Sequence, residues 1–413
     1  MSNKKKNIVI LSTMYHPDMG APSACVDKYV QALKDKYNFY IITKTYKTDI
    51  VPDGKYKIRY ISSFIHRVIL KCNKNIDESR FIWLNKIVLF CCNIYKLITT
   101  QFCYPTSGRW EITEYYRELK KLSEEIEINT VIAVSNTFFP QFSVSRFKET
   151  YQNINYIAFI YDPFSENYVY YQYKLFKKWW KQKNRKNEEL IYQKADAIFF
   201  SEEMYCFALN NFKFNLAKTH CLYFPLSDIR KNQYHVDNSP LIRLIYAGAL
   251  YKKIRNPEFM LFVMSQVNGI RLDLFVNKGE CEDIIEKYIS NVITRNYFVG
   301  RDRYDEMICN EYDILVNIGN ISTLQAPSKM LELLSTGRPI LNFYFAKDNQ
   351  YQMIEKYPLG LNIGYHEENA VEKVTKFCHR VKGHILSFEE VSALYPENAL
   401  GNQVKLLETL ING

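Results

Sequence analysis

Short apolar runs recur along the first half of the chain, with helical patterns between several of them. The apolar runs predict buried strands at residues 8–13, 39–43, 58–61, 130–134, 156–161 and 197–200. Residues 23–37 and 111–127 place their apolar side chains on one face and predict amphipathic helices. Strands that alternate with helices pair in parallel, so this half predicts a doubly wound α/β sheet.

The pattern restarts after a polar stretch, residues 228–240, which is rich in Asn, Asp, Lys and Arg. Further strands are predicted at 243–247, 271–276, 297–299, 314–316 and 340–343, with a helix at 257–267. A chain of 413 residues is too long for one core. We expect two Rossmann-like domains, residues 1–230 and 240–395. The last segment, 396–413, holds a helix that is a candidate to return to the first domain.

Composition places the chain among globular proteins, because 47% of its residues are hydrophobic and it has few Pro and Gly. The ten cysteines are scattered and form no Cys-x-x-Cys, so neither a zinc site nor a disulfide framework is indicated. The apolar run at residues 8–11 is too short for a signal peptide. We expect a cytoplasmic protein with reduced thiols.

The net charge of +10 is concentrated in one segment that also contains tryptophans. Its central residues are Lys177, Lys178, Trp179, Trp180 and Lys181. Cations that meet lipid headgroups, with aromatic rings at the interface, suit an anionic membrane surface. A solvated helix face and a nucleic-acid site are the alternatives. We favour the membrane, on the inner face of the cell membrane, and expect no nucleic-acid partner.

Residues 81–102 form another apolar stretch. Only a narrow polar stripe interrupts it, at Asn85, Lys86, Asn93, Lys96 and Thr100. Two lysines and two asparagines argue against a helix that spans a bilayer. Two interpretations stay open: a helix buried inside the domain, and a helix that lies in the membrane interface.

The segment 326–341 reads as a loop, a helix of two turns, a glycine stop and a buried strand. Pro327 and Ser328 precede the helix, and Ser328 is a good N-cap. Gly337 stands where a left-handed residue ends a helix. The first N–H groups of a helix are unpaired and attract anions, and Lys329 adds a full positive charge at this end.

Glu332 lies one turn further along the same helix. A capping box would require Glu or Gln at residue 331, where this chain has Leu. Glu332 is therefore available to accept hydrogen bonds from two vicinal sugar hydroxyls. Together, Pro327, Ser328, Lys329 and Glu332 predict a site for the diphosphate and ribose of a nucleotide.

Two other strand ends of the second half contribute candidate residues. Gly248 follows the strand at 243–247, and a guanidinium or ammonium soon after it, from Arg255 or Lys253, can pair phosphate oxygens. Asn317 and Asn320 lie at and just beyond the end of the strand at 314–316. Their amides can bond sugar hydroxyls or the diphosphate. Surface cations in a loop are the alternative for Lys253 and Arg255.

Polar residues also follow two strands of the first half. His16 and Gly20 lie between the strand at 8–13 and the next helix, where a glycine lets the backbone approach a ligand. Asp162 follows the strand at 156–161 and precedes a proline. Because ligands bind at the carboxyl ends of parallel strands, His16 and Asp162 are candidates to contact an acceptor. An ordinary turn is the alternative for each.

The segments 248–257 and 313–339 resemble the donor site of retaining glycosyltransferases with the GT-B fold, in particular glycosyltransferase family four. In that family a Pro-Ser-Lys-like loop meets the diphosphate and a helical Glu meets the ribose. An Arg or Lys after a Gly-x-Leu stabilises the departing diphosphate. The resemblance implies these roles for residues 327–329, Glu332 and Arg255. It departs at Leu324, where the family usually has a Glu that contacts the transferred sugar.

The loop from His16 to Gly20 resembles the Pro-x-x-Gly loop of the same family, with Ala21 in place of a second glycine. The resemblance implies two domains that face each other across a cleft. It also implies transfer of a sugar from a nucleotide diphosphate to an acceptor hydroxyl with retention of configuration. A lipid-linked saccharide acceptor, in bacterial capsule, exopolysaccharide or O-antigen synthesis, follows from the analogy and the basic aromatic segment.

No Asp-x-Asp occurs in the chain, so a metal-bound diphosphate is not indicated and we expect no cofactor or metal. Two other functions stay open. A sugar-nucleotide epimerase on the same fold would need acid and base groups that converge on the sugar, and no clear His/Glu pair is visible. A non-catalytic protein that binds nucleotide sugars or membranes is the second, and the residue at position 324 is its best argument.

Overall fold

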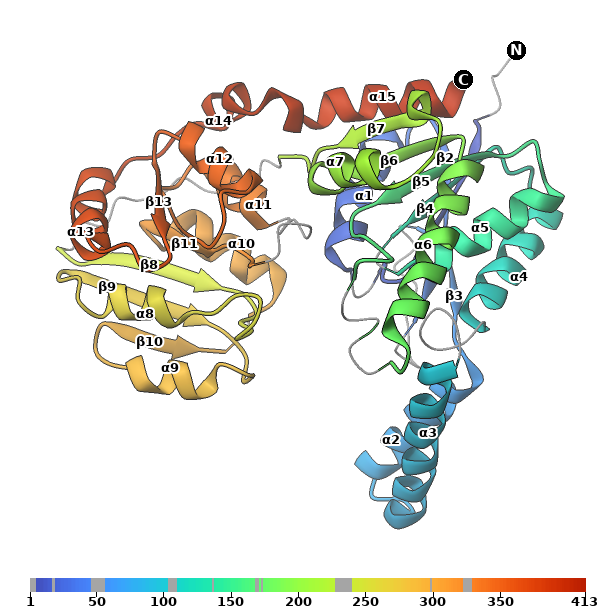
Figure 1. The fold of residues 1–413 in the computed structure, drawn as a ribbon, viewed down its shortest axis with the longest axis horizontal. Helices are drawn as coiled ribbons and strands as arrows, with labels where there is room; N and C mark the ends of the chain where they lie inside the picture. Colours follow the sequence, from blue (N-terminus) through green and yellow to red (C-terminus); the bar gives the residue numbers. More distant parts are fainter. Residues whose placement is uncertain are drawn as a thin grey trace. The chain divides into compact units, whose positions relative to one another are not determined.

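The computed structural model describes residues 5–16, 19–45, 56–102, 110–135, 137–167, 171, 174–226, 240–297, 299–321 and 329–413. Internal contacts divide the chain into two units. The first comprises Met1–Tyr223 together with Val404–Gly413, and the second comprises Phe224–Gln403. Each unit is built on its own parallel sheet (Figure 1). Both sheets alternate with helices, as the sequence pattern predicts for a doubly wound α/β protein.

The first sheet has seven parallel strands in the order β3-β2-β1-β4-β5-β6-β7. Their bounds are β1 Asn7–Ser12, β2 Asn38–Lys44, β3 Lys57–Ile61, β4 Thr130–Val134, β5 Asn155–Ile160, β6 Ala197–Ser201 and β7 Thr219–Leu222. The six strands predicted from apolar runs all form within one or two residues of the expected bounds. The edge strand β7 has only one buried residue, Leu222, so it gives no apolar run to recognise.

Helices cover both faces of the first sheet (Figure 1). Besides the hairpin described next, they are α1 Ala21–Leu33, α4 Trp110–Glu125, α5 Phe139–Thr150, α6 Lys177–Lys194 and α7 Glu202–Asn211, with a 3-10 turn η2 at Leu216–Lys218. The apolar stripe of α4, with Tyr115 and Leu119, is fully buried in the core, and the helix packs against β2 and β3. Burial of apolar side chains on the strands and helices holds this unit together.

Two antiparallel helices, α2 Phe64–Asp77 and α3 Ile82–Phe102, are inserted between β3 and α4. They form a hairpin that projects from the sheet (Figure 1). Asn85 of α3 is buried, and its side-chain oxygen accepts a hydrogen bond from Asn75 Nδ2 of α2 at 3.3 Å. Most other side chains of α3 are exposed. The interpretation of 81–102 as a helix buried in the domain is therefore wrong.

The end of the chain packs against the amino edge of the first sheet. The last helix, α15, spans Leu400–Asn412, and its residues from Val404 onward belong to the first unit. Lys6 Nζ donates to the Ile411 carbonyl at 3.0 Å, and Asn155 Nδ2 donates to the Leu410 carbonyl at 2.6 Å. Lys36 forms an ion pair of 2.8 Å with Glu408. These contacts tie the last helix to the strands that begin at Asn7 and Asn155.

The second sheet has six parallel strands in the order β10-β9-β8-β11-β12-β13. Their bounds are β8 Ile242–Ala247, β9 Ile270–Phe275, β10 Ile293–Asn296, β11 Ile314–Ile318, β12 Ile340–Tyr344 and β13 Gly360–Gly364. The strand predicted at 297–299 is misplaced, because β10 ends at Asn296 and Tyr297 is 67% exposed beyond it. The prediction followed the apolar run at 297–299, whereas the strand itself, Ile293–Asn296, is mostly polar and gives no such run.

Apolar cores lie on both faces of the second sheet. The covering helices are α8 Glu258–Met264, α9 Glu282–Tyr288, α10 Arg301–Asn310, α11 Lys329–Ser335, α12 Asn349–Lys356, α13 Ala370–Val381 and α14 Phe388–Leu394, followed by a 3-10 turn η3 at Pro396–Asn398. Helix α11 ends as predicted, with Gly337 in the left-handed conformation at φ 72°. Its N–H donates to the Leu334 carbonyl at 2.9 Å, which closes the helix.

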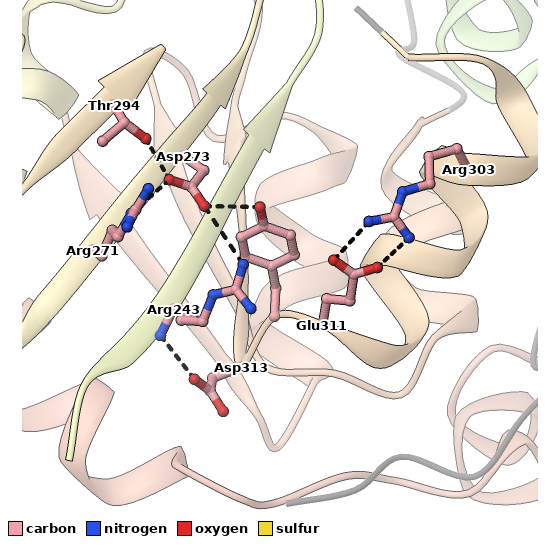
Figure 2. A network of polar contacts seen from close by, with 8 residues as sticks. Arg243, Arg271, Asp273, Thr294, Arg303, Glu311 and Asp313 are labelled. Atoms are coloured by element: carbon pink, nitrogen blue, oxygen red, sulfur yellow. Dashed lines mark hydrogen bonds and ion pairs between the residues drawn. The ribbon is translucent and has the colours of Figure 1, made fainter. Parts of the chain in front are cut away.

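A buried carboxylate joins three strands of the second sheet (Figure 2). Asp273 of β9 accepts hydrogen bonds from Arg271 Nε at 3.0 Å and from Tyr312 Oη at 2.8 Å. It also accepts one from the Thr294 hydroxyl of β10, and Arg243 Nη2 of β8 lies 3.8 Å away. Because these groups satisfy a carboxylate that is only 4% exposed, we assign this network to sheet stability.

Candidate functional site

Gly248 follows the carboxyl end of β8 and turns the chain at φ 154°. Its N–H donates to the Phe275 carbonyl of β9 at 3.2 Å. A Cβ at this position would lie 3.4 Å from Tyr246 Oη, 3.6 Å from Lys329 Nζ and 3.7 Å from Arg255 Nη1. A glycine thus leaves a small space that three polar groups surround, as expected where backbone approaches a ligand.

Arg255 is held by a tight turn that follows Gly248. Tyr251 and Arg255 exchange backbone hydrogen bonds of 3.2 and 2.8 Å. The Ile254 carbonyl accepts from the Ile321 N–H at 2.8 Å, which links this turn to the segment after β11. Asn320 lies in that segment, and its Oδ1 accepts from Arg255 Nε at 3.2 Å and Nη2 at 2.9 Å. The predicted residues Gly248, Arg255 and Asn320 therefore lie together.

Lys329 brings a second cation to the same place from the start of α11. Its ammonium donates to the Ala247 carbonyl and lies 4.7 Å from the centre of the Tyr304 ring. The pKa of Lys329 is lowered to about 8, mainly by burial; the nearby charge of Glu332 opposes this decrease, and the cations of Arg255 and Arg301 contribute to it. The ammonium is therefore poorly compensated in this site and would be stabilised by an added anion.

Neither cation beside Gly248 has a carboxylate partner within 4 Å in the part of the chain that the structure describes. Arg255 contacts the neutral side chain of Asn320, and Lys329 contacts a carbonyl and an aromatic ring. Two like charges so close together repel each other and are stabilised by an anion between them. Phosphate oxygens fit this arrangement, because a guanidinium pairs two of them and an ammonium a third.

Glu332 is not without a partner, contrary to the sequence argument. Its Oε1 accepts a hydrogen bond of 2.8 Å from Arg301 Nη1, and Arg301 Nε donates to Asp305 at 3.0 Å. Glu332 and Arg301 remain partly exposed, at 25% and 56% of their side chains. Arg301 can therefore hold the carboxylate in one orientation while one face of it stays accessible.

Asn317 lies apart from these cations. Both hydrogens of its amide are used inside the sheet, one to Asn342 Oδ1 at 2.8 Å and one to Gln350 Oε1 at 3.0 Å. Asn342 continues the ladder to Asn362 Oδ1 at 2.7 Å. The side chain of Asn317 is 4% exposed. The structure thus places Asn317 in a hydrogen-bonded ladder across β11, β12 and β13 rather than beside Arg255.

The structure gives no direct evidence for the predicted nucleotide contacts of Pro327, Ser328 and Lys253. Pro327 and Ser328 lie outside the described residues, as does Leu324, so their predicted roles stay predictions. Lys253 is described and exposed, and it makes none of the contacts that hold Arg255. Its neighbour Lys252 pairs with Asp283 at 2.7 Å on the surface. Arg255, and not Lys253, is the cation that the turn directs to Gly248.

In the first unit, His16 follows the carboxyl end of β1. Its ring stacks on Tyr56 with centroids 4.7 Å apart, and its Nε2 is buried without a hydrogen-bond partner among the described residues. Tyr15 and Tyr56 each donate to Asp27 Oδ1 at 2.7 Å. Gly20 caps α1 at φ −77°, so its backbone conformation does not require glycine. Among the described residues, His16 Nε2 thus remains a buried nitrogen without a hydrogen-bond partner at the end of β1.

Asp162 follows β5 at the same edge of the first sheet. Burial raises the pKa of its carboxyl to about 6. The following loop is fixed by the buried Glu188 of α6, whose carboxylate accepts from Phe164 N at 3.1 Å, Ser165 N at 3.0 Å and Tyr192 Oη at 2.6 Å. Burial raises the pKa of Glu188 as well, although these hydrogen bonds oppose the increase. Asp162 is thus a partly buried carboxyl on a well-anchored loop.

The basic aromatic segment forms α6, and its residues separate into two groups. Trp180 is 5% exposed and Lys174 Nζ lies 3.7 Å from its ring centre, so Trp180 belongs to the core and its assignment to the membrane surface is corrected. Lys181 pairs with Glu166 at 2.5 Å. Lys177, Lys178 and Trp179 are exposed. Only part of the segment therefore offers a basic surface.

No protein-family model and no curated protein matches the chain. Solved structures do match over the whole length. WaaG, a glycosyltransferase involved in lipopolysaccharide biosynthesis, is 11% identical, with 98% of this chain and 100% of that chain covered and a TM-score of 0.62. Anabaena Alr3699/HepE in complex with UDP and glucose is 10% identical, with 98% and 99% covered and a TM-score of 0.63. A glycosyltransferase from Rickettsia africae is 11% identical, with 98% of each chain covered and a TM-score of 0.61.

The chain has the GT-B fold. At this level of identity the likeness establishes the arrangement of elements and not the chemistry. Within the GT-B fold, Gly248, Arg255, Asn320 and Lys329 lie at the carboxyl ends of the second sheet, and His16 and Asp162 at those of the first. The expected fold class is confirmed. Of the predicted donor-site residues, the structure groups Gly248, Arg255, Asn320 and Lys329.

Sequence reasoning missed three residues of this GT-B site. Tyr246, Tyr304 and Arg301 surround Lys329 and Glu332, but they come from β8 and α10, far from α11 in the chain. No local pattern marks them, because an aromatic ring in a strand and an arginine at a helix start are both common. Within the described part of the GT-B chain, no group of three or more His, Cys, Asp and Glu is placed to hold a metal ion.

Proposed function

We propose that the protein is a retaining glycosyltransferase that moves a sugar from a nucleotide-diphosphate sugar to an acceptor hydroxyl. The single observation that supports this best is the pair of cations beside Gly248, Arg255 and Lys329, neither of which has a carboxylate partner among the described residues. The fold is consistent with it, because the similar HepE structure holds UDP and glucose. The diphosphate of the donor would occupy the space next to Gly248.

In this proposal Arg255 and Lys329 act mainly on the leaving diphosphate. Negative charge grows on it as the bond to the sugar breaks, so fixed positive groups stabilise the transition state more than the bound donor. The Ser328 amide would contribute to the same anion, and no metal would be needed. Glu332, oriented by Arg301, would accept hydrogen bonds from the ribose hydroxyls.

The acceptor would bind at the first sheet. Asp162 lies on the anchored loop after β5 and can accept a hydrogen bond from the attacking hydroxyl once it is ionised. His16 follows β1 at the carboxyl end of the same sheet, and its Nε2 has no hydrogen-bond partner among the described residues. We propose a lipid-linked saccharide at the cytoplasmic face of a bacterial membrane as the acceptor, in polysaccharide synthesis. Exposed Lys177, Lys178 and Trp179 support it.

The first test is a binding screen with the purified full chain. UDP-, GDP-, ADP- and TDP-sugars, and each free diphosphate, are compared for thermal stabilisation, with Arg255→Ala and Lys252→Ala measured in parallel. One nucleotide should raise the melting temperature of the wild type and of Lys252→Ala equally, and that of Arg255→Ala by a smaller amount. If no nucleotide does so, the donor site is refuted.

The second test is turnover with that donor and a mixture of lipid-linked saccharides. The proposal expects a glycosylated product whose anomeric configuration, read from proton couplings by nuclear magnetic resonance, equals that of the donor. An inverted product contradicts retention. An epimerised nucleotide sugar formed without acceptor identifies the protein as an epimerase, and tight binding without any product identifies it as a non-catalytic binder.

A further inference from the structure

The α2–α3 hairpin exposes a wide apolar face to solvent. Its largest exposed side chains recur every three or four residues along α3 and so share one face: Trp83 at 68%, Ile87 at 50%, Phe90 at 65%, Ile94 at 42% and Leu97 at 61%. Soluble monomers rarely expose so continuous an apolar surface. An exposed apolar face of this size is typical of a surface that contacts a partner or a membrane.

A second segment of the first unit adds apolar side chains beside the end of α3. Gln101 Oε1 accepts a hydrogen bond of 2.8 Å from the Leu175 N–H, which joins the last turn of α3 to the start of α6. Leu175, Phe176 and Trp179 are 61%, 80% and 54% exposed. Two distant parts of the chain therefore contribute to the same exposed region.

Positive charge surrounds this region. Residues 64–102 contain six Lys or Arg and only two acidic residues. Arg67, Lys71, Lys86 and Lys96 are exposed on the two helices of the hairpin. Lys177 and Lys178 are exposed beside Phe176. An apolar face with tryptophans and surrounding cations is complementary to an anionic phospholipid surface, and a neutral protein surface would not require the cations.

We propose that the exposed face of α3, together with Leu175, Phe176 and Trp179, inserts into the interface of an anionic phospholipid bilayer. This surface is called the hairpin face below. The proposal does not rest on the glycosyltransferase activity, because it uses none of the residues of the donor site. The sequence predicts membrane binding by the basic segment of α6. The surface proposed here is larger, and α3 supplies most of its apolar side chains.

The hairpin face lies in the membrane plane and does not span it. Ile82–Thr99 is long and apolar enough to cross a bilayer, with a mean hydropathy of 1.3 and 6% of its residues buried. However, Lys86, Asn93 and Lys96 would then be placed in the hydrocarbon. The partner helix α2 has only 14 residues and contains Arg67 and Lys71. Interfacial insertion keeps these cations at the headgroups.

The topology places the hairpin at the carboxyl ends of the strands of the first sheet, where the candidate acceptor residues also lie. Helix α2 begins three residues after the carboxyl end of β3, and the segment that contains Leu175 follows the carboxyl end of β5. All strands of this sheet are parallel, so His16 and Asp162 lie at the same edge as the hairpin. A lipid that extends from the bilayer would reach this edge first.

Vesicle binding of the full chain tests the proposal. Wild type is sedimented with phosphatidylcholine vesicles that contain no phosphatidylglycerol or about one third of it. The variant Phe90→Glu with Leu97→Glu should lower the partition coefficient for the anionic vesicles by about tenfold or more, because two apolar contacts are replaced by charges that the surface repels. Vesicles without phosphatidylglycerol should bind wild type weakly.

The matched control introduces the same two changes elsewhere. Leu216→Glu with Phe262→Glu replaces a Leu that is 59% exposed and a Phe that is 48% exposed, outside the hairpin face. This control should bind vesicles like wild type, and nucleotide stabilisation should be the same in all three proteins. Equal vesicle binding by the hairpin variant and wild type would overturn the proposal.

A second measurement does not depend on whether the variant Phe90→Glu with Leu97→Glu folds. Trp83 fluorescence, taken as the difference between wild type and Trp83→Phe, should shift to the blue with anionic vesicles and be quenched by lipids brominated along the acyl chain. An unchanged Trp83 spectrum contradicts insertion. If light scattering instead shows a wild-type dimer without lipid that Phe90→Glu with Leu97→Glu separates, a second copy covers the face and the proposal is wrong.

Discussion

Lys329 Nζ and Arg255 Nη1 lie 3.6 and 3.7 Å from the same point, the position that a Cβ of Gly248 would take. The two cations come from different elements, Lys329 from the start of α11 and Arg255 from the turn after β8. Their described hydrogen-bond partners are neutral. The charge of Glu332 favours the Lys329 ammonium, but the two cations still disfavour each other until an anion binds.

Gly248→Ala should weaken nucleotide binding by about tenfold or more, because the new methyl group occupies the space between the cations. The matched control is Gly269→Ala. Gly269 also has a positive φ, 74°, but a Cβ there meets nothing within 4 Å. Isothermal titration with the nucleotide found in the screen measures both. If the two variants lose affinity equally, backbone strain and not the space at Gly248 explains the effect.

Arg255→Ala should lower kcat much more than donor affinity, because negative charge on the diphosphate is larger in the transition state than in the bound donor. The comparison is Lys252→Ala, an exposed lysine nearby that pairs with Asp283. Steady-state kinetics, together with the dissociation constant of the donor, separates the two effects. An equal loss in kcat and affinity would limit Arg255 to binding.

Nucleotide affinity should decrease as the pH rises through about 8, the pKa to which burial lowers Lys329. The anion binds the ammonium form, so above this pKa binding must also take up a proton, and affinity falls by up to about tenfold for each pH unit. Lys329→Met should bind more weakly at pH 7 and remove this dependence. The same slope in wild type and Lys329→Met would assign it to another group.

Glu332→Ala should weaken nucleotide binding by about tenfold, since it loses the ribose hydrogen bonds and leaves Arg301 without one of its carboxylates. Asp305→Ala removes the other carboxylate of Arg301 and serves as the comparison. Binding of the nucleoside diphosphate and of inorganic diphosphate is measured for each variant. A loss that is the same for both ligands would assign Glu332 to the diphosphate side and not to the ribose.

Activity should rise with pH through about 6 if Asp162 accepts the proton of the acceptor hydroxyl. Burial raises the pKa of this carboxyl to about 6, so it is protonated and inactive below that pH and ionised above it. The profile of kcat/KM against pH should lose its acidic limb in Asp162→Asn, with a large loss of rate. An unchanged acidic limb in that variant would exclude Asp162 as the group that titrates.

Much of the fold follows from local patterns in the sequence. Continuous apolar runs identify most strands, such as β4 and β8, because strands buried on both faces must be apolar throughout. Gly337 and the polar position before it mark the end of α11 for the same local reason. The edge strands β7 and β13 were missed, since they have few buried residues and leave weak patterns.

The candidate site also has a part that the sequence predicts and a part that it does not. The sequence identifies Gly248, Arg255, Asn320 and Lys329 one by one, because each follows a strand end or starts a helix, where polar groups face ligands. It cannot show that Asn317 is used inside the sheet, that Glu332 is held by Arg301, or that Trp180 is buried while Trp179 is exposed.

The two-unit α/β fold class and the segments that hold the candidate residues can be predicted from the amino-acid pattern alone, since hydrophobic periodicity and helix ends are local properties of the chain. Which side chains meet depends on the folded structure. It brought Arg255 and Lys329 to one glycine and left the apolar face of α3 uncovered. Contacts of this kind join residues far apart in the chain, and their energies depend on burial and distance, which no local pattern records.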